Sequence, residues 1–136
     1  MNKETLSLQA SMDDIDRLKP FIEHVASQAG IDRNETRRLR LAAEEAVANV
    51  INYGQATVIT LQAEKTDGQL TITIEDNGLP FDPTQGSATD LSIPADQRPL
   101  GGMGIIMLER MTDGLSYQRA NGHNILTLKK NIPDLL

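Results

Sequence analysis

Runs in which polar and apolar residues alternate are joined in pairs by tight turns, and this pattern predicts an antiparallel sheet. The period of two is typical of strands that are buried on one face. Asp67-Gly68 joins one pair of runs and Ala120-Asn121-Gly122 joins the other. An Asx-Gly pair between alternating runs is a strong signal for a β-hairpin. The predicted strands span residues 5–10, 57–65, 69–75, about 115–119 and about 124–129.

Apolar residues recur at helical spacing between the first predicted strand and the first hairpin. Ser11 can cap a first helix that ends at Gly30, and Pro20 inside it predicts a kink or a late helix start. Asp32 is a good N-cap for a second helix, which runs to about Tyr53. A short third helix is predicted after the glycine cluster at residues 101–104.

The order of these elements predicts an α+β protein, a two-layer α/β sandwich with helices on one face of a mostly antiparallel sheet. The length of 136 residues fits a single domain over residues 1–136. Residues 79–100 contain four prolines and form a long irregular loop. A loop of this length within a compact domain is more often functional than a simple connection, so residues 83–99 are interpreted as a lid.

Composition excludes several classes of function. A net charge of −6 and 3% aromatic residues argue against a nucleic-acid partner, which needs clustered cations and stacking side chains. The absence of cysteine excludes disulfides and a thiol nucleophile. No apolar run approaches the ~20 residues of a membrane span, and the first residues do not resemble a signal peptide. A cytoplasmic protein without membrane contact is therefore expected.

Glu45 and Asn49 are the first candidate functional residues, because side chains four apart on a helix lie on one face. Asn49 offers an amide oxygen as a weak ligand for Mg²⁺, which retains waters and binds phosphate oxygens. Glu45 could accept a proton from an attacking hydroxyl. Such a spacing also arises by chance, and taken alone it is better explained by Glu45 as a solvated helix residue like Glu44.

The other candidate residues follow the helix in the order expected of a nucleotide site. Asp76, in Asp76-Asn77-Gly78, ends an apolar strand and could accept a hydrogen bond from an exocyclic amine, or could simply form an Asx turn. The glycines of Gly101-Gly102-Met103-Gly104 open a helix, where backbone N–H groups could meet phosphates. Arg98 could reach a terminal phosphate, and Thr127 lies on the last strand.

Together these motifs resemble those of the GHKL superfamily of ATP-binding domains, which have the Bergerat fold. The closest resemblance is to the small bacterial anti-sigma-factor serine/threonine kinases. The turn after Asp76 lacks the second glycine of the superfamily's Asp-x-Gly-x-Gly, and its Gly-Leu-Pro-Phe-Asp sequence resembles the small anti-sigma branch. The matching segments are Glu45-Ala46-Val47-Ala48-Asn49, Asp76-Asn77-Gly78, Gly101-Gly102-Met103-Gly104-Ile105 and Asn124-Ile125-Leu126-Thr127-Leu128.

The resemblance implies the cofactors ATP and Mg²⁺ and a role for each matching residue. Glu45 would be the general base, Asn49 the Mg²⁺ ligand and Asp76 the residue that reads adenine. The remaining nucleotide contacts implied are Gly78, Gly102, Gly104 and Thr127. The implied partners are a STAS-domain antagonist that is phosphorylated and a sigma factor that is sequestered, and a homodimer is implied as well.

Two alternatives to a serine/threonine kinase remain open. A non-catalytic, ATP-gated binding protein of the same fold would need Asn49 and Asp76 but not Glu45. A detached histidine-kinase domain is less well supported, since no helix pair with a phosphoacceptor histidine is present. For the arginine cluster of Arg33, Arg37, Arg38 and Arg40, the favoured explanation is a solvated face that pairs with Glu35 and other acids, and the alternative is a docking surface for an acidic partner.

Overall fold

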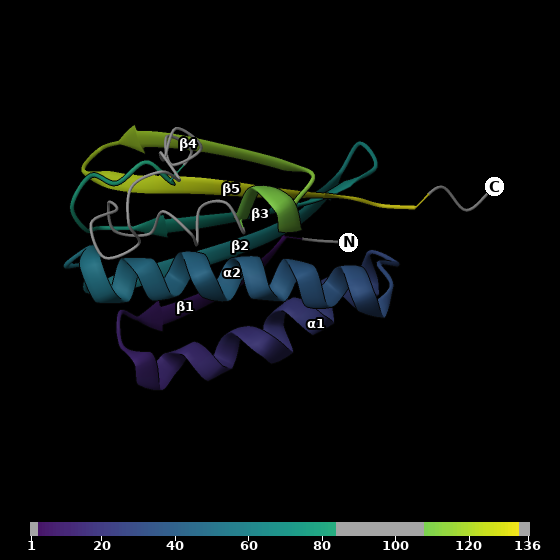
Figure 1. The fold of residues 1–136 in the computed structure, drawn as a ribbon, viewed down its shortest axis with the longest axis horizontal. Helices are drawn as coiled ribbons and strands as arrows, with labels where there is room; N and C mark the ends of the chain where they lie inside the picture. Colours follow the sequence, from purple (N-terminus) through teal and green to yellow (C-terminus); the bar gives the residue numbers. More distant parts are fainter. Residues whose placement is uncertain (1–2, 84–107, 134–136) are drawn as a thin grey trace, which may run out of the picture.

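In a computed structural model, residues 3–83 and 108–133 are described, and they form one sheet covered by helices (Figure 1). The five strands are β1 (Glu4–Gln9), β2 (Val58–Thr66), β3 (Gln69–Asp76), β4 (Gly114–Ala120) and β5 (His123–Asn131). The helical elements are a 3₁₀ helix η1 (Met12–Arg17), α1 (Leu18–Gln28) and α2 (Arg33–Tyr53). Residues 108–111 are also helical.

The sheet is antiparallel throughout, with the strand order β1-β2-β3-β5-β4. Asp67 and Gly68 have φ angles of 49° and 77°, and Asn121 and Gly122 have 55° and 78°. Positive φ at two consecutive residues is the geometry of a type I′ turn, whose twist matches that of the strands. Both predicted hairpins are therefore confirmed. β3 and β5 lie side by side although β4 and the long loop separate them in sequence.

Local sequence signals explain where the helices begin and end. The hydroxyl of Ser11 accepts a hydrogen bond from the Asp13 amide at 3.2 Å, and Pro20 lies in the first turn of α1, where its missing N–H costs little. The late helix start predicted from Pro20 is confirmed. Asp32 caps α2 by accepting from the Glu35 amide at 2.8 Å, and Gly30 follows α1 with φ of 78°.

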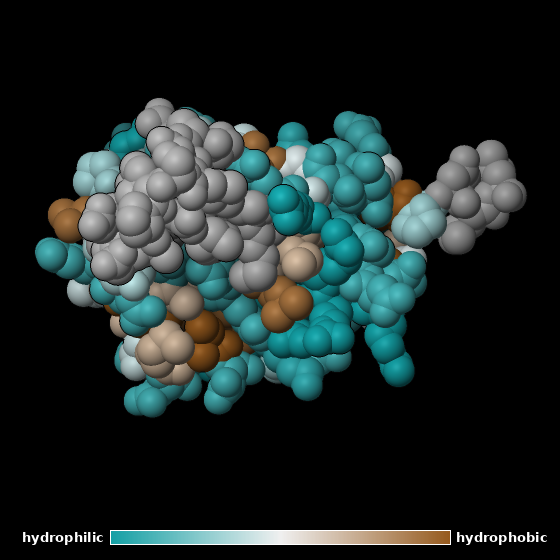
Figure 2. Space-filling model, in the orientation of Figure 1, coloured by the Kyte–Doolittle hydropathy of each residue, from teal (hydrophilic) through white to brown (hydrophobic). Residues whose placement is uncertain are grey.

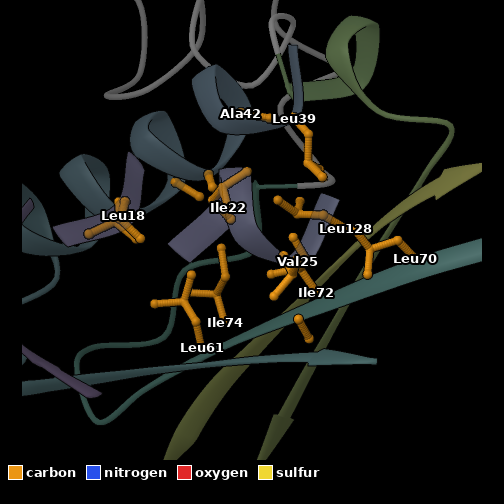
Figure 3. Packing of buried hydrophobic residues seen from close by; sticks show 14 of the residues in the cluster. Leu18, Ile22, Val25, Leu39, Ala42, Leu61, Leu70, Ile72, Ile74 and Leu128 are labelled. Carbon is orange, nitrogen blue, oxygen red and sulfur yellow. The ribbon is translucent and has the colours of Figure 1, made fainter. Parts of the chain in front are cut away.

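The hydrophobic core lies between the helices and one face of the sheet, as Figures 1 and 3 show. Residues of β3 alternate between buried and half-buried, so Leu70, Ile72 and Ile74 all point toward the helices. Ile22 of α1 and Leu39 of α2 are fully buried against them. The predicted two-layer α+β sandwich is confirmed.

Part of the predicted loop lies outside the described residues. Residues 79–83 are irregular, as expected, while the rest of the lid interpretation, together with Arg98, Gly102 and Gly104, falls on residues that are not described. The described residues also include no helix with the length and apolarity of a bilayer span.

Candidate functional site

A cavity of about 170 Å³ opens between the C-terminal half of α2 and the ends of β3, β4 and β5. Its wall is mostly apolar, with a small number of polar side chains that come from separate elements. Pockets of this composition are typical of small-molecule sites, where the few polar groups orient the ligand. The lining residues include Ala46, Asn49, Val50, Tyr53, Ile74, Asp76, Leu79, Phe81, Pro83, Tyr117, Asn124 and Leu126.

Asp76 supplies the carboxylate of this cavity. It is the last residue of β3 and only 4% exposed. Its Oδ1 accepts hydrogen bonds from the Gly78 amide at 2.8 Å and from Asn124 Nδ2 at 3.0 Å. Oδ2 accepts no hydrogen bond from residues 3–83 or 108–133. The two hydrogen bonds to Oδ1 orient the carboxylate, so that Oδ2 can accept from a ligand.

Asn124 holds the Asp76 carboxylate in place. It lies directly opposite Asp76 in the β3–β5 register and is 5% exposed. Its Nδ2 also donates to the Leu79 carbonyl at 2.7 Å, while its Oδ1 accepts from the Phe81 amide at 3.2 Å and from the Tyr117 hydroxyl at 2.5 Å. All four hydrogen-bonding positions of the amide are thus filled.

Sequence reasoning missed both Asn124 and Tyr117. The signal that could have identified Asn124 is its position two and four residues before the buried Leu126 and Leu128, because residues of one parity share a strand face. A polar residue at a buried position of that strand needs partners, and the register with Asp76 supplies them. The position of Tyr117 depends on the strand order, which the sequence does not specify.

Thr127 lies on the other face of the sheet. It is half-buried between the buried Leu126 and Leu128, and its neighbours across the ladder are Thr73 and Ser116. Side chains of adjacent strand residues point to opposite faces, so Thr127 points away from the cavity that Leu126 lines. The structure therefore does not bring Thr127 to the cavity, whereas Asn124 of the same strand lines it.

Gly78 lies where the fold leaves no room for a side chain. A Cβ added there would lie 2.3 Å from the Gly54 carbonyl oxygen and 3.1 Å from the Ala56 Cβ. The neighbouring Leu79 amide donates to that same carbonyl at 2.7 Å. The turn after β3 therefore packs directly on the end of α2. Gly78 does not line the cavity as the described residues form it, and it contributes by letting Asp76 and α2 approach each other.

The helix wall of the cavity carries Asn49, which is 8% exposed. Its Nδ2 is buried and has no hydrogen-bond partner among the described residues. An unpaired buried amide is destabilising, so it marks a position where a ligand group is expected. The amide can also turn about its last torsion and present its oxygen instead.

Glu45 lies one turn before Asn49 on the same side of α2 and is half-buried. It does not line the cavity itself but stands at its border, where a second molecule could approach. Among the described residues, no group of three or more acidic or histidine side chains could hold a metal ion. A metal here would therefore rely on Asn49 and on oxygens of its ligand, which is the manner in which Mg²⁺ binds with phosphates.

These groups suit a planar ring that carries an amine. Apolar side chains of α2, β3 and β5 line the cavity and can enclose a ring. Asp76 Oδ2 can accept a hydrogen bond from an exocyclic N–H, and Asn49 lies on the helix side of the cavity. Adenine has this combination of an apolar face and an exocyclic amine. The residues present therefore fit an adenine nucleotide accompanied by Mg²⁺.

Comparison with known proteins agrees with a nucleotide site. Residues 8–130 match the family of histidine kinase-like ATPase domains. The chain is 30% identical over 129 residues to the serine/threonine-protein kinase BtrW of Bordetella bronchiseptica, covering 92% of this chain and 91% of BtrW. It is 24% identical over 136 residues to the anti-sigma F factor of Clostridium perfringens, covering 96% of this chain and 97% of that protein.

A solved structure shows the same fold. The crystal structure of the RsbU and RsbW domains of Rv1364c from Mycobacterium tuberculosis superposes with a TM-score of 0.71 at 17% identity. The match covers 97% of this chain and 33% of the mycobacterial chain. The superposition agrees with the α+β architecture described above.

Proposed function

The chain belongs to the family of histidine kinase-like ATPase domains, and we propose that it is an ATP-dependent protein serine/threonine kinase that acts as an anti-sigma factor. In this proposal it works in a bacterial partner switch, where it phosphorylates a STAS-type antagonist and sequesters a sigma factor when that antagonist is absent. The names of the similar proteins, a serine/threonine-protein kinase and an anti-sigma F factor, support both halves of the proposal.

The observation that carries the proposal is the pair of incompletely bonded polar groups on opposite sides of one apolar cavity. Within the described residues, Asp76 Oδ2 on the strand side accepts no hydrogen bond and Asn49 Nδ2 on the helix side donates none. Asp76 would accept the exocyclic amine of adenine, and Asn49 would hold Mg²⁺ through its amide oxygen. Bound Mg²⁺-ATP would supply the phosphoryl group and neutralise charge on it.

Glu45 is the residue proposed to act on the acceptor. It would take the proton of a serine or threonine hydroxyl as that oxygen bonds to the terminal phosphorus and the bond from this phosphorus to ADP breaks. A positioned general base of this kind contributes about 10²–10⁴ to the rate. Its place at the border of the cavity suits a proton acceptor that must meet a group on another protein.

The experiment is transfer of labelled phosphate from ATP with Mg²⁺ to a purified STAS-domain protein from the same cells, with Glu45→Gln beside the wild type. We expect Glu45→Gln to lower the rate by at least about a hundredfold, in line with the loss of a general base. Its ADP affinity, measured by calorimetry, is expected to stay within twofold. Equal loss of transfer and of ADP binding would contradict the role assigned to Glu45.

A second candidate function is an ATP-gated binding protein without kinase activity. It is favoured by the position of Glu45, which does not line the cavity, whereas Asn49 and Asp76 do. In this case the wild type binds ATP tightly and labels no protein, and Glu45→Gln holds its partner as well as the wild type does. We propose a cytoplasmic location and a homodimer in either case.

A further inference from the structure

Five residues of α2 at successive intervals of four form one continuous ridge that leads to the cavity. Arg33, Arg37, Leu41, Glu45 and Asn49 follow one another along the helix. Side chains four apart are neighbours, and their row is inclined to the helix axis. The ridge therefore begins on the solvent side of α2 and ends at Asn49 in the wall of the cavity.

The first two members of this ridge are exposed cations. Arg33 and Arg37 make no hydrogen bond or ion pair with the part of the chain that the structure describes. Their neighbours differ, because Arg38 donates to the Arg110 carbonyl at 3.0 Å and Arg40 pairs with Glu44 at 2.9 Å. Figure 2 shows hydrophilic side chains gathered over the N-terminal half of α2.

The stability of α2 does not explain an arginine at position 33. It is the first residue of α2, directly after the N-cap Asp32. The positive end of the helix dipole lies there, so a cation is unfavourable and an acid would be preferred. An unpaired arginine at this position suggests a role in binding something outside the chain.

Leu41 adds an apolar contact between the cations and Glu45. It is half-buried, yet it is not one of the partly buried residues that pack on the described core, as Val50 and Ile51 do. The ridge thus presents two cations, then an apolar side chain, then the proposed general base.

We propose that Arg33, Arg37 and Leu41 are the docking surface for the protein that accepts the phosphoryl group, and that this acceptor presents an acidic patch to them. This inference rests on the proposed kinase function. A hydroxyl placed at Glu45 belongs to a protein that covers about 800 Å² around it, a patch with a radius of ~16 Å. Arg37 lies eight residues from Glu45, or about 12 Å along the helix, and so falls within that patch. Arg33 lies twelve residues from Glu45, or about 18 Å, and so stands at the edge of the patch.

Charge also favours an acidic protein, rather than a second copy of this chain or a nucleic acid, as the molecule that binds this surface. The chain has a net charge of −6, so these two cations stand out from their surroundings and would steer an acidic partner toward Glu45. A second copy bound symmetrically through the same surface would bring four arginines of like charge into one interface. Two free cations on an acidic protein are also too few for a nucleic-acid surface.

The test measures phosphorylation of the purified STAS-domain protein by the double variant Arg33→Glu/Arg37→Glu. We expect the KM for this acceptor to rise at least tenfold, with kcat and ADP affinity within twofold of the wild type. Lys19→Glu/Lys65→Glu makes the same charge change at two exposed positions outside the ridge, and should leave KM within twofold. Thermal unfolding of each variant checks that the fold is retained.

Direct binding separates this inference from the kinase proposal. Acceptor affinity is measured with ADP bound, when no transfer can occur. Binding that is weakened at least tenfold by Arg33→Glu/Arg37→Glu supports the docking surface even if the wild type transfers no phosphate. Normal transfer with an unchanged KM overturns the docking surface and leaves the kinase standing. Loss of self-association without a change in KM would assign the ridge to a second copy and also overturn it, and a wild type that neither binds nor phosphorylates this protein overturns both.

Discussion

The two walls of the cavity differ in how completely their polar groups are bonded. On the strand wall, the Asn124 amide makes four hydrogen bonds, and Asp76 is fixed through one of its oxygens. On the helix wall, Asn49 is almost as buried, but its amide nitrogen has no partner among the described residues.

This contrast indicates that the two walls have different roles in binding a ligand. The strand wall is pre-organised because hydrogen bonds hold its Asn124 and Asp76 side chains, so it can bind a ring without first ordering them. An unsatisfied helix wall is less stable without ligand, so binding there is coupled to stability. Four substitutions test the contrast, beginning with the largest expected effect.

Gly78→Ala should disrupt the contact on which both walls depend. The added methyl group meets the Gly54 carbonyl oxygen at 2.3 Å, and both atoms belong to rigid backbone segments. We expect the free energy of unfolding to fall by about 3 kcal/mol, the upper range for overpacking. Chemical denaturation measures this loss. Full stability combined with weak ADP binding would instead show that Gly78 faces the nucleotide, as the sequence predicted.

Asp76→Asn should remove the acceptor from the strand wall while preserving its shape. Hydrogen bonds to charged groups contribute about 1.5–3 kcal/mol, so ADP affinity should fall by roughly 70-fold. Calorimetry with ADP provides the measurement, and the matched control is Glu75→Gln, the preceding residue, which faces the other side of the sheet. An affinity within threefold of the wild type would remove Asp76 from the site.

Asn124→Ala should loosen the strand wall without altering a predicted ligand contact. Leu79, Phe81 and Tyr117 each lose a partner, so we expect the free energy of unfolding to fall by about 2 kcal/mol, with weaker ADP binding as Asp76 loses its support. Thr127→Ala, on the opposite face of the same strand, is the control and should leave ADP affinity within twofold. The reverse pattern would restore Thr127 to the site and exclude Asn124 from it.

Asn49→Leu should raise the free energy of unfolding, whereas Gly78→Ala and Asn124→Ala should lower it. Replacing an unpaired buried amide by an apolar side chain of similar size is expected to raise the free energy of unfolding by about 1 kcal/mol in the absence of nucleotide. The same change should abolish the increase in ATP affinity that Mg²⁺ provides. A destabilised variant would show that Asn49 has a structural partner.

Local patterns predicted the elements because each depends on a few adjacent residues. The Asx-Gly pairs have the positive φ angles that their turns require, and Ser11 and Asp32 cap the helices that follow them. The candidates Glu45, Asn49 and Asp76 were found in the same way, since i,i+4 spacing and the end of a strand are local features. The roles of Arg98, Gly102 and Gly104 remain predictions.

The sequence by itself determined the strands, the helices, the turns and the residue types that can bind a nucleotide, because these depend on periodicity and on the conformations of single residues. Only the tertiary structure decided which of these residues meet. The register of β5 against β3 places Asn124 opposite Asp76, and the alternation of side chains along β5 directs Thr127 to the other face of the sheet. The turn after β3 approaches the backbone at Gly54 so closely that position 78 has no room for a side chain. Both facts are contacts between segments far apart in sequence, and no local pattern specifies them.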